Sequence, residues 1–360
     1  MEIHEALDAA LRAVEEVNGT DLVLTIGERP MIRLDGAIRP VDGLRQIDDA
    51  LMDNYLADLL GGDRTALERD LDVDFAFSHG HNRFRGNVFF QRGMPAVALR
   101  LIQSRIPTFD EIGLPVSVQE LVQLKQGLVL FCGPTGSGKS TSMATMVDAI
   151  NAERPCHIIT IEDPVEYLHD NHRAVVHQRE VGIDAQSFDR ALRAALREDP
   201  DVVLVGEMRD PESIAITLTL AETGHLVLSS LHTNDAPQTL DRIVDVFPSD
   251  RQGQIRQQLA STLCGVVAQR LVPRIGGGLI AAYEVLLGTP PVQNLVREGK
   301  VNQLRNAMQI ALTAGHKTLE MSLNELVAAG IITHETAVAT AFVPHEIQGA
   351  GIVSPLAAQA

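Results

Sequence analysis

The sequence has no apolar run long enough to cross a membrane. Its longest such runs, residues 127–132 and 281–288, are far shorter than the roughly 18 apolar residues that a membrane-spanning helix needs. Glu2, Glu5 and Asp8 also stand where a signal peptide would carry basic residues, and no apolar segment follows them. We therefore expect a cytoplasmic protein that does not insert into the membrane, and we expect both apolar runs to be buried strands.

Basic residues are few relative to acidic ones. The chain has 30 lysines and arginines against 47 aspartates and glutamates, which gives a formal net charge of −17. Broad nucleic-acid binding needs a basic surface that displaces counterions from phosphates, so this balance argues against it and leaves only a local basic patch open.

Cysteine is also scarce. The three cysteines, Cys132, Cys156 and Cys264, are isolated and form no C-x-x-C pair. An odd number in a chain of 360 residues argues against a disulfide framework. We expect all three to be small apolar side chains in a reducing cytosol.

The first part of the chain mixes two kinds of apolar pattern. Short alternating runs predict strands, Gly-containing pairs predict turns, and two longer patterns predict helices. The predicted strands are 21–25, 31–34 and 84–90, the turns are at Gly27, 35–36 and 79–80, and the helices are 3–16 and 48–60. This mixture predicts an α+β domain over residues 1–104, followed by a Pro-containing linker over 105–115.

After the linker, strands and helices alternate, which is typical of a parallel sheet with crossover helices. The run 127–132 is continuously apolar, as a strand buried on both faces should be. Further buried strands are expected at 157–161, 202–205 and 226–231, and the pattern from about residue 250 is mostly helical. We predict an α/β domain over residues 116–345 that includes C-terminal helices, and a disordered tail over 346–360.

One segment points directly to nucleotide chemistry. Residues 133–140 read Gly-Pro-Thr-Gly-Ser-Gly-Lys-Ser and match G-x-x-x-x-G-K-S/T in full. Glycines let backbone N–H groups surround phosphates, and the following helix turns its positive end toward the anion. Lys139 should bridge the β- and γ-phosphates, and Ser140 should bind Mg²⁺. The predicted nucleotide-binding residues are Gly133, Pro134, Thr135, Gly136, Ser137, Gly138, Lys139, Ser140 and Thr141.

A chance Gly-rich turn is the alternative interpretation of this segment. The apolar strand before it and the amphipathic helix after it, with Met143, Met146, Val147 and Ile150 at helical spacing, argue against that alternative.

Polar residues follow the other predicted strands. Glu162 follows the strand 157–161, and Glu207 follows 202–205 after Gly206, where a Walker B segment usually has Asp-Glu. Ligands bind beyond the carboxyl ends of parallel strands, and ATP hydrolysis needs a carboxylate near Mg²⁺ and a group that orients water. We predict Glu207 and Glu162 as catalytic, with Glu207 also near the metal; the alternative is two solvated carboxylates.

Four segments in order resemble the signatures of the secretion ATPases. Residues 133–140, 160–164, 204–210 and 221–226 resemble their Walker A, Asp box, Walker B and His box, and the resemblance extends from about residue 3 to 345. It implies a hexameric ring whose subunits have a small N-terminal α+β PAS-like domain and a RecA-like P-loop NTPase domain, with ATP bound between the two.

The resemblance also implies roles for residues that their spacing alone does not assign. His225 would contact the γ-phosphate, with His232 a weaker candidate, although a structural histidine is the usual interpretation of such a residue. Arginines of the first domain would reach the phosphates as the domains close; the candidates are Arg83, Arg85, Arg92 and Arg100. The alternative for them is a row of solvated or salt-bridged strand arginines.

Two absences indicate a branch of the family. Gln269-Arg270-Leu271 runs on without the four-cysteine zinc insertion of the assembly and secretion ATPases, and the chain lacks the large N-terminal domain of the extension motors. Both point to the pilus retraction branch, which powers twitching motility, and to a protein without zinc.

That branch carries a C-terminal Ala-Ile-Arg-Asn-Leu-Ile-Arg-Glu signature. Residues 291–298 keep its second half, in which Asn294, Leu295, Arg297 and Glu298 are the candidate retraction residues. Pro291 and Gln293 depart from its first half, and Val23 occupies a position where the family has His. A plain amphipathic surface helix is the alternative for 291–298.

The resemblance thus implies a Mg²⁺-dependent ATPase, with ATP and Mg²⁺ bound, that forms a homo-hexamer. Its partner would be an inner-membrane pilus platform protein, at the inner face of the cytoplasmic membrane, and a paralogous retraction ATPase is a further candidate partner. The alternatives are a pilus-extension or type II secretion ATPase, a RecA-like nucleic-acid motor, and a non-hydrolysing regulator; the missing zinc insertion, the acidic charge and the two glutamates argue against them in turn.

Overall fold

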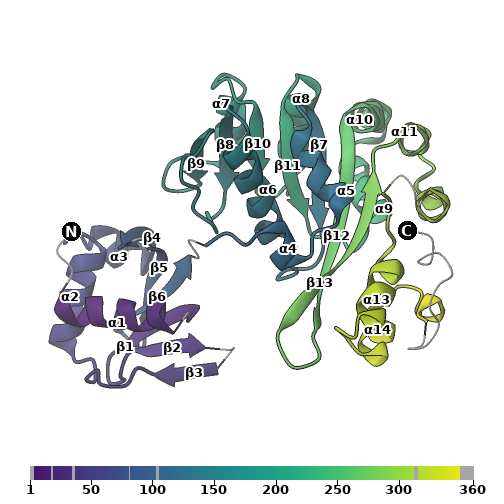
Figure 1. Cartoon of the computed structure of the whole chain (residues 1–360). Helices are drawn as coiled ribbons and strands as arrows, with labels where there is room; N and C mark the ends of the chain where they lie inside the picture. Colours follow the sequence, from purple (N-terminus) through teal and green to yellow (C-terminus); the bar gives the residue numbers. More distant parts are fainter. Residues whose placement is uncertain are drawn as a thin grey trace. The chain divides into compact units, whose positions relative to one another are not determined.

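The structure is a computed structural model that describes residues 4–17, 19–34, 37–80, 82–102, 105–311 and 315–348. The chain divides into two compact units, Met1–Arg105 with Glu166–Leu168, and Ile106–Val165 with His169–Ala360. The turn predicted at 35–36 and residues 349–360 of the predicted tail lie outside the described residues. Figure 1 labels most elements of each unit.

The first unit is an antiparallel sheet with helices, as the α+β pattern predicted. Its strand order is β3-β2-β1-β6-β5-β4. The strands are β1 (Asp21–Thr25), β2 (Met31–Leu34), β3 (Ala37–Pro40), β4 (Asp72–His79), β5 (Asn82–Gln91) and β6 (Met94–Ile102), and the helices are α1 (Glu5–Glu16), α2 (Asp49–Leu59) and α3 (Thr65–Asp70). Leu7, Leu11 and Val14 of α1 lie on one side of the helix and are buried, because residues at this spacing share a face.

The second unit is built on a sheet of seven strands in the order β13-β12-β7-β11-β10-β8-β9. The strands are β7 (Gly127–Cys132), β8 (His157–Glu162), β9 (Val175–Glu180), β10 (Val202–Val205), β11 (Leu226–Leu231), β12 (Leu263–Pro273) and β13 (Leu279–Leu287). All neighbours are parallel except β13, which pairs antiparallel with β12.

Helices cover both faces of this sheet. They are α4 (Phe109–Ile112), α5 (Val116–Gln119), α6 (Lys139–Glu153), α7 (Phe188–Ala195), α8 (Pro211–Glu222), α9 (Ala236–Asp245), α10 (Ser249–Thr262), α11 (Pro290–Arg297), α12 (Leu304–Ile310), α13 (Leu319–Ala328) and α14 (His334–Thr340), with short 3-10 turns at Glu120–Gln123, Val301–Gln303 and Pro344–Glu346. Leu128 and Leu130 of β7 pack into the core beneath α7 to α10, whereas Val129 and Phe131 pack into the core beneath α6. The continuous apolar sequence of β7 is therefore explained by burial on both faces.

Two features of the second unit differ from the sequence prediction. The region after residue 250 contains the predicted helices, α10 to α14, but also the β12–β13 hairpin, of which only the second strand was anticipated by its apolar run. Buried strands and buried helices cannot be told apart by periodicity, because both are apolar on all sides. Residues 105–115, predicted as a linker, contain α4, whose start is capped by Thr108 and Glu111.

In the described part of the chain, no helix is both long enough and apolar enough to cross a membrane.

Candidate nucleotide-binding and hydrolysis site

The loop between β7 and α6 has a backbone that requires glycine. Gly133, Gly136 and Gly138 have φ angles of 144°, 77° and 89°, values that residues with a side chain rarely adopt. A Cβ atom on Gly133 would lie 2.3 Å from the carbonyl oxygen of Gln269, and one on Gly138 would lie 2.6 Å from the Gln269 side-chain amide nitrogen. The glycines of the predicted P-loop are thus set by backbone conformation and by the close approach of β12.

Lys139 begins α6 and folds back over this loop. Its Nζ donates hydrogen bonds to the carbonyl oxygens of Gly133 at 2.8 Å and Pro134 at 3.1 Å, and the residue is only 7% exposed. Nearby, the Oγ atom of Ser137 is buried and has no hydrogen-bond partner among the described residues. A buried cation and an unpaired buried hydroxyl are both satisfied by an anion, so this loop fits the phosphate groups of a nucleotide.

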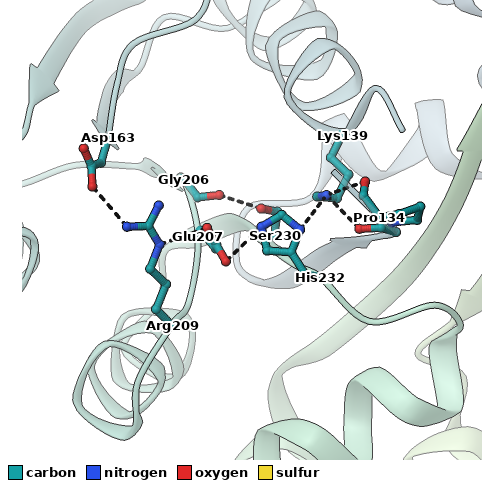
Figure 2. A network of polar contacts seen from close by, with 9 residues as sticks. Pro134, Lys139, Asp163, Gly206, Glu207, Arg209, Ser230 and His232 are labelled. Atoms are coloured by element: carbon teal, nitrogen blue, oxygen red, sulfur yellow. Dashed lines mark hydrogen bonds and ion pairs between the residues drawn. The ribbon is translucent and has the colours of Figure 1, made fainter. Parts of the chain in front are cut away.

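A chain of polar contacts connects Lys139 to the acid that follows β10 (Figure 2). The Nδ1 atom of His232 lies 3.4 Å from Lys139 Nζ, and its Nε2 atom lies 3.1 Å from Glu207 Oε1. The other oxygen of Glu207 accepts a hydrogen bond from Arg209 Nε at 3.0 Å, and Arg209 also reaches Asp163 Oδ2 at 3.1 Å. The ends of β7, β11, β10 and β8 supply these residues, because parallel strands bring their carboxyl ends to one edge of the sheet.

The partners of His232 indicate where its ring proton lies. The ammonium group of Lys139 can only donate, and the carboxylate of Glu207 can only accept. Both contacts are satisfied by the tautomer that carries the proton on Nε2, which then donates to Glu207. His232 therefore contacts both Glu207 and the lysine of the predicted P-loop, although the sequence analysis ranked it below His225.

Glu162 lies on the strand beside Gly206. A Cβ atom at position 206 would lie 3.2 Å from the Ile161 carbonyl oxygen and 3.4 Å from Glu162 Cα, so a residue larger than glycine would crowd β8. Glu162 Oε1 accepts hydrogen bonds from Thr160 Oγ1 at 2.6 Å and from Gln178 Nε2 at 3.3 Å. Glu162 is thus adjacent to the Walker B segment and is hydrogen-bonded to side chains of β8 and β9.

His225 lies at the opposite edge of the sheet, which corrects its predicted role. Its carbonyl oxygen accepts from Gly127 N at 3.0 Å, at the amino ends of β11 and β7, and its Nδ1 lies 2.9 Å from the Leu220 carbonyl oxygen. The P-loop follows the other end of β7, and a strand of 6 residues spans about 20 Å. This position contradicts the predicted contact between His225 and a γ-phosphate on the P-loop of the same chain, whereas His232, at the carboxyl end of β11, lies beside Lys139.

Gln269 of β12 is a site residue that the sequence analysis used only as a landmark. It is 2% exposed, and its Oε1 accepts a hydrogen bond from Ser142 Oγ of α6 at 3.0 Å. Its backbone and amide also lie against Gly133 and Gly138. The signal for it was a polar side chain within an apolar run, which went unused because β12 was not anticipated as a strand.

We expect Gln269→Leu to weaken nucleotide binding. Leucine has a similar size but cannot accept from Ser142, and the loss of one buried hydrogen bond is worth about 1 kcal/mol, or about a fivefold change in an equilibrium constant. The KM for ATP should rise about fivefold with a smaller change in kcat, measured by steady-state phosphate release. Gln257→Leu, on the exposed side of α10, is the matched control. An unchanged KM in Gln269→Leu would remove Gln269 from the site.

The four candidate arginines of the first unit, Arg83, Arg85, Arg92 and Arg100, lie on β5, β6 and the turn between them. Arg85 and Arg100 are cross-strand partners, and Arg100 Nε bonds Asp21 at 2.9 Å. Arg83 Nε is buried without a hydrogen-bond partner among the described residues, and Arg92 is exposed in the turn with a φ of 52°. The salt-bridge alternative thus describes Arg100, and a role in phosphate binding stays a prediction for the others.

The candidate retraction residues lie on α11 and its C-terminal end. Arg297 Nη1 contacts Asn294 Oδ1, Leu295 packs partly buried against the main core, and Glu298 is the C-cap. Pro291 falls in the first turn of the helix, where proline is tolerated because its missing N–H would have no partner in the helix. The departure at position 291 is thus compatible with an intact helix.

No three His, Cys, Asp or Glu side chains gather into a metal cage within the described residues. Mg²⁺ at nucleotide sites needs only one or two protein ligands, since phosphates and waters complete its shell. Ser140, in the first turn of α6, and Glu207 are the residues that suit this role.

The chain is similar to several known proteins. The family model described as type II/IV secretion system protein matches residues 73–277. The type IV pilus retractation ATPase PilT of Pseudomonas aeruginosa is 44% identical over 327 residues, which cover 90% of this chain and 95% of that protein. A twitching motility protein of Neisseria gonorrhoeae is 42% identical over 86% of this chain and 83% of its own length. The crystal structure of the pilus retraction motor PilT with bound ADP has a TM-score of 0.88 and 44% identity, covering 96% of this chain and 99% of that one.

Proposed function

The chain belongs to the type II/IV secretion system protein family, and from this premise we propose that it is an ATP-hydrolysing motor that powers the retraction of type IV pili. The proposal of ATP hydrolysis is supported mainly by the chain of contacts that runs from Lys139 through His232 to Glu207 beside the P-loop. The retraction part is supported by similarity over nearly the whole length to proteins named for pilus retraction and twitching motility.

In the proposed mechanism, the P-loop backbone and Lys139 hold the β- and γ-phosphates of ATP. Mg²⁺, held by Ser140 and Glu207, would neutralise charge on the phosphate oxygens. Glu207 orients the attacking water and accepts its proton, while His232 and Arg209 hold the carboxylate in place. Glu162 assists from the neighbouring strand.

We extend the proposal to the assembly. Six copies would form a ring. One or more of Arg83, Arg85, Arg92 and Arg100 in the first unit would neutralise phosphate charge. Hydrolysis would then allow the two units, closed around ATP, to open. The ring would work at the inner face of the cytoplasmic membrane on a pilus platform protein, through the helix that carries Asn294 and Arg297. We also propose that the two domains span residues 1–104 and 116–345.

Deletion of the gene tests the direction of the motor. Cells should accumulate surface pili that do not retract, because assembly continues without the reverse motor, and wild-type protein should relieve this whereas Glu207→Ala should not. Pilus number and retraction events would be scored by microscopy of labelled pili. Glu120→Ala, an exposed glutamate of the same unit, is the control and should restore retraction. Bald cells would instead indicate an extension motor.

A further inference from the structure

Glu284 is a buried carboxylate next to the site that the proposed mechanism does not use. It is 3% exposed in the middle of β13, opposite Ala268 of β12, and Ala268 in turn pairs with Cys132, the residue before the P-loop. A buried acid lowers stability unless it has a specific partner. Its presence in this sheet therefore requires a structural or functional reason.

The partner of Glu284 is the start of helix α9. Glu284 Oε1 accepts a hydrogen bond at 2.8 Å from the backbone N–H of Ala236, the first residue of the helix. The first N–H groups of a helix have no partner within it, and its N-terminal end favours a negative charge. Asp235 caps the same end by accepting from Gln238 N at 2.7 Å.

The segment held in this way carries His232. Strand β11 ends at Leu231 and α9 begins at Ala236, so His232 lies in a connection of only four residues, 232–235. A hydrogen bond of 2.6 Å between the hydroxyls of Thr233 and Thr239 ties this connection to the first turns of α9. With β11 fixed in the sheet, the position of the α9 N-terminus determines where the His232 ring lies between Lys139 and Glu207.

We propose that Glu284 is a positioning residue for ATP hydrolysis: by anchoring the N-terminus of α9, it holds His232 in contact with Glu207 and Lys139. The inference rests on the proposed role of His232 in holding the Glu207 carboxylate. Glu284 touches neither nucleotide nor water in this scheme, so it acts on the turnover step rather than on nucleotide binding.

The charge of Glu284 and its anchoring role are separable. Burial raises the pKa of Glu284 to about 7, the N–H of Ala236 lowers it, and Asp235 and Glu320 raise it further. The remaining charged or titratable groups that face it are Arg305 of α12 and Cys132 of β7. A folded-state pKa above the unfolded value adds stability at low pH that is lost as the pH rises through about 7. Both the acid and the carboxylate can accept from Ala236, so a neutral amide should preserve the anchor.

The test compares Glu284→Gln, which keeps an acceptor, with Glu284→Leu, which removes it. We expect Glu284→Leu to lower kcat about tenfold with KM for ATP changed less than about threefold, and Glu284→Gln to retain kcat within about twofold. In a His232→Ala background, Glu284→Leu should add little further loss, because both changes affect the same group. Glu284→Gln should also flatten the dependence of Tm on pH between about 4.5 and 7, the range over which the folded protein binds a proton at Glu284 that the unfolded chain does not.

A control and a second variant test whether the loss of kcat reflects only a loss of stability. Glu320→Leu removes an equally buried acid, 1% exposed on α13, and should lower Tm without lowering kcat of the folded protein. If Glu284→Leu does not fold, Ala236→Pro removes the donated N–H at a first helical position, where proline is favoured, and should reproduce the kcat loss.

The outcomes separate this inference from the proposed function. A wild-type kcat in folded Glu284→Leu or Ala236→Pro, together with a large loss in His232→Ala, would overturn the positioning role alone. A loss in Glu284→Leu that adds in full to that of His232→Ala would also overturn it. Wild-type turnover in His232→Ala would instead refute the role of His232 in the proposed mechanism.

Discussion

Replacing Lys139 with alanine is expected to abolish ATP hydrolysis, with a loss of roughly 10³-fold in kcat, the upper range for removing one transition-state donor. Lys139 is the buried cation of the P-loop, held over it by two backbone carbonyls. Its ammonium would neutralise the charge that develops on the transferred phosphoryl group, and no other lysine lies in or next to this loop in the sequence. Phosphate release under saturating ATP is the measurement.

Lys125→Ala is the matched control for this substitution. Lys125 is exposed and lies just before β7, so its removal changes the net charge equally without touching the P-loop. The control should keep wild-type turnover. Hydrolysis that survived in folded Lys139→Ala would contradict the whole nucleotide mechanism.

Glu207→Gln is expected to lower kcat by about 10² to 10³-fold while ATP still binds, because a general base contributes about 10² to 10⁴-fold. Glutamine has almost the same shape and can still accept from His232 Nε2, so the fold of the site should persist. It cannot accept a proton from water, and it loses the ion pair with Arg209. Single-turnover kinetics and the affinity for a fluorescent ATP analogue distinguish the two steps.

Glu153→Gln, at the exposed C-terminal end of α6, is the control for a glutamate-to-amide change in the same unit. Loss of ATP binding in Glu207→Gln, with chemistry unchanged once ATP is bound, would assign the carboxylate to metal or nucleotide binding alone. Full turnover would remove Glu207 from the catalytic group.

Much of the site followed from the order of residue types along the chain. The P-loop is local: its glycines, Lys139 and Ser140 are consecutive, and the strand before it and the helix after it are visible in the same stretch. Glu207 could be predicted because it directly follows an apolar strand, and parallel strands place such residues at one edge. The α/β class of the second unit and the α+β class of the first followed from their periodicities in the same way.

The tertiary structure decided which distant residues meet. His225 and His232 lie at opposite ends of the same strand, and the resemblance favoured the former; the parallel pairing of β11 with β7 shows that His232 is the one at the P-loop edge. Gln269 and Glu284 went unpredicted because they lie in the β12–β13 hairpin, whose apolar runs do not reveal that β12 packs beside β7. Local motifs can therefore be predicted from the sequence, because the chain itself keeps their residues close together. The partners of a side chain across a sheet are set by strand order and register, which depend on how the whole core packs.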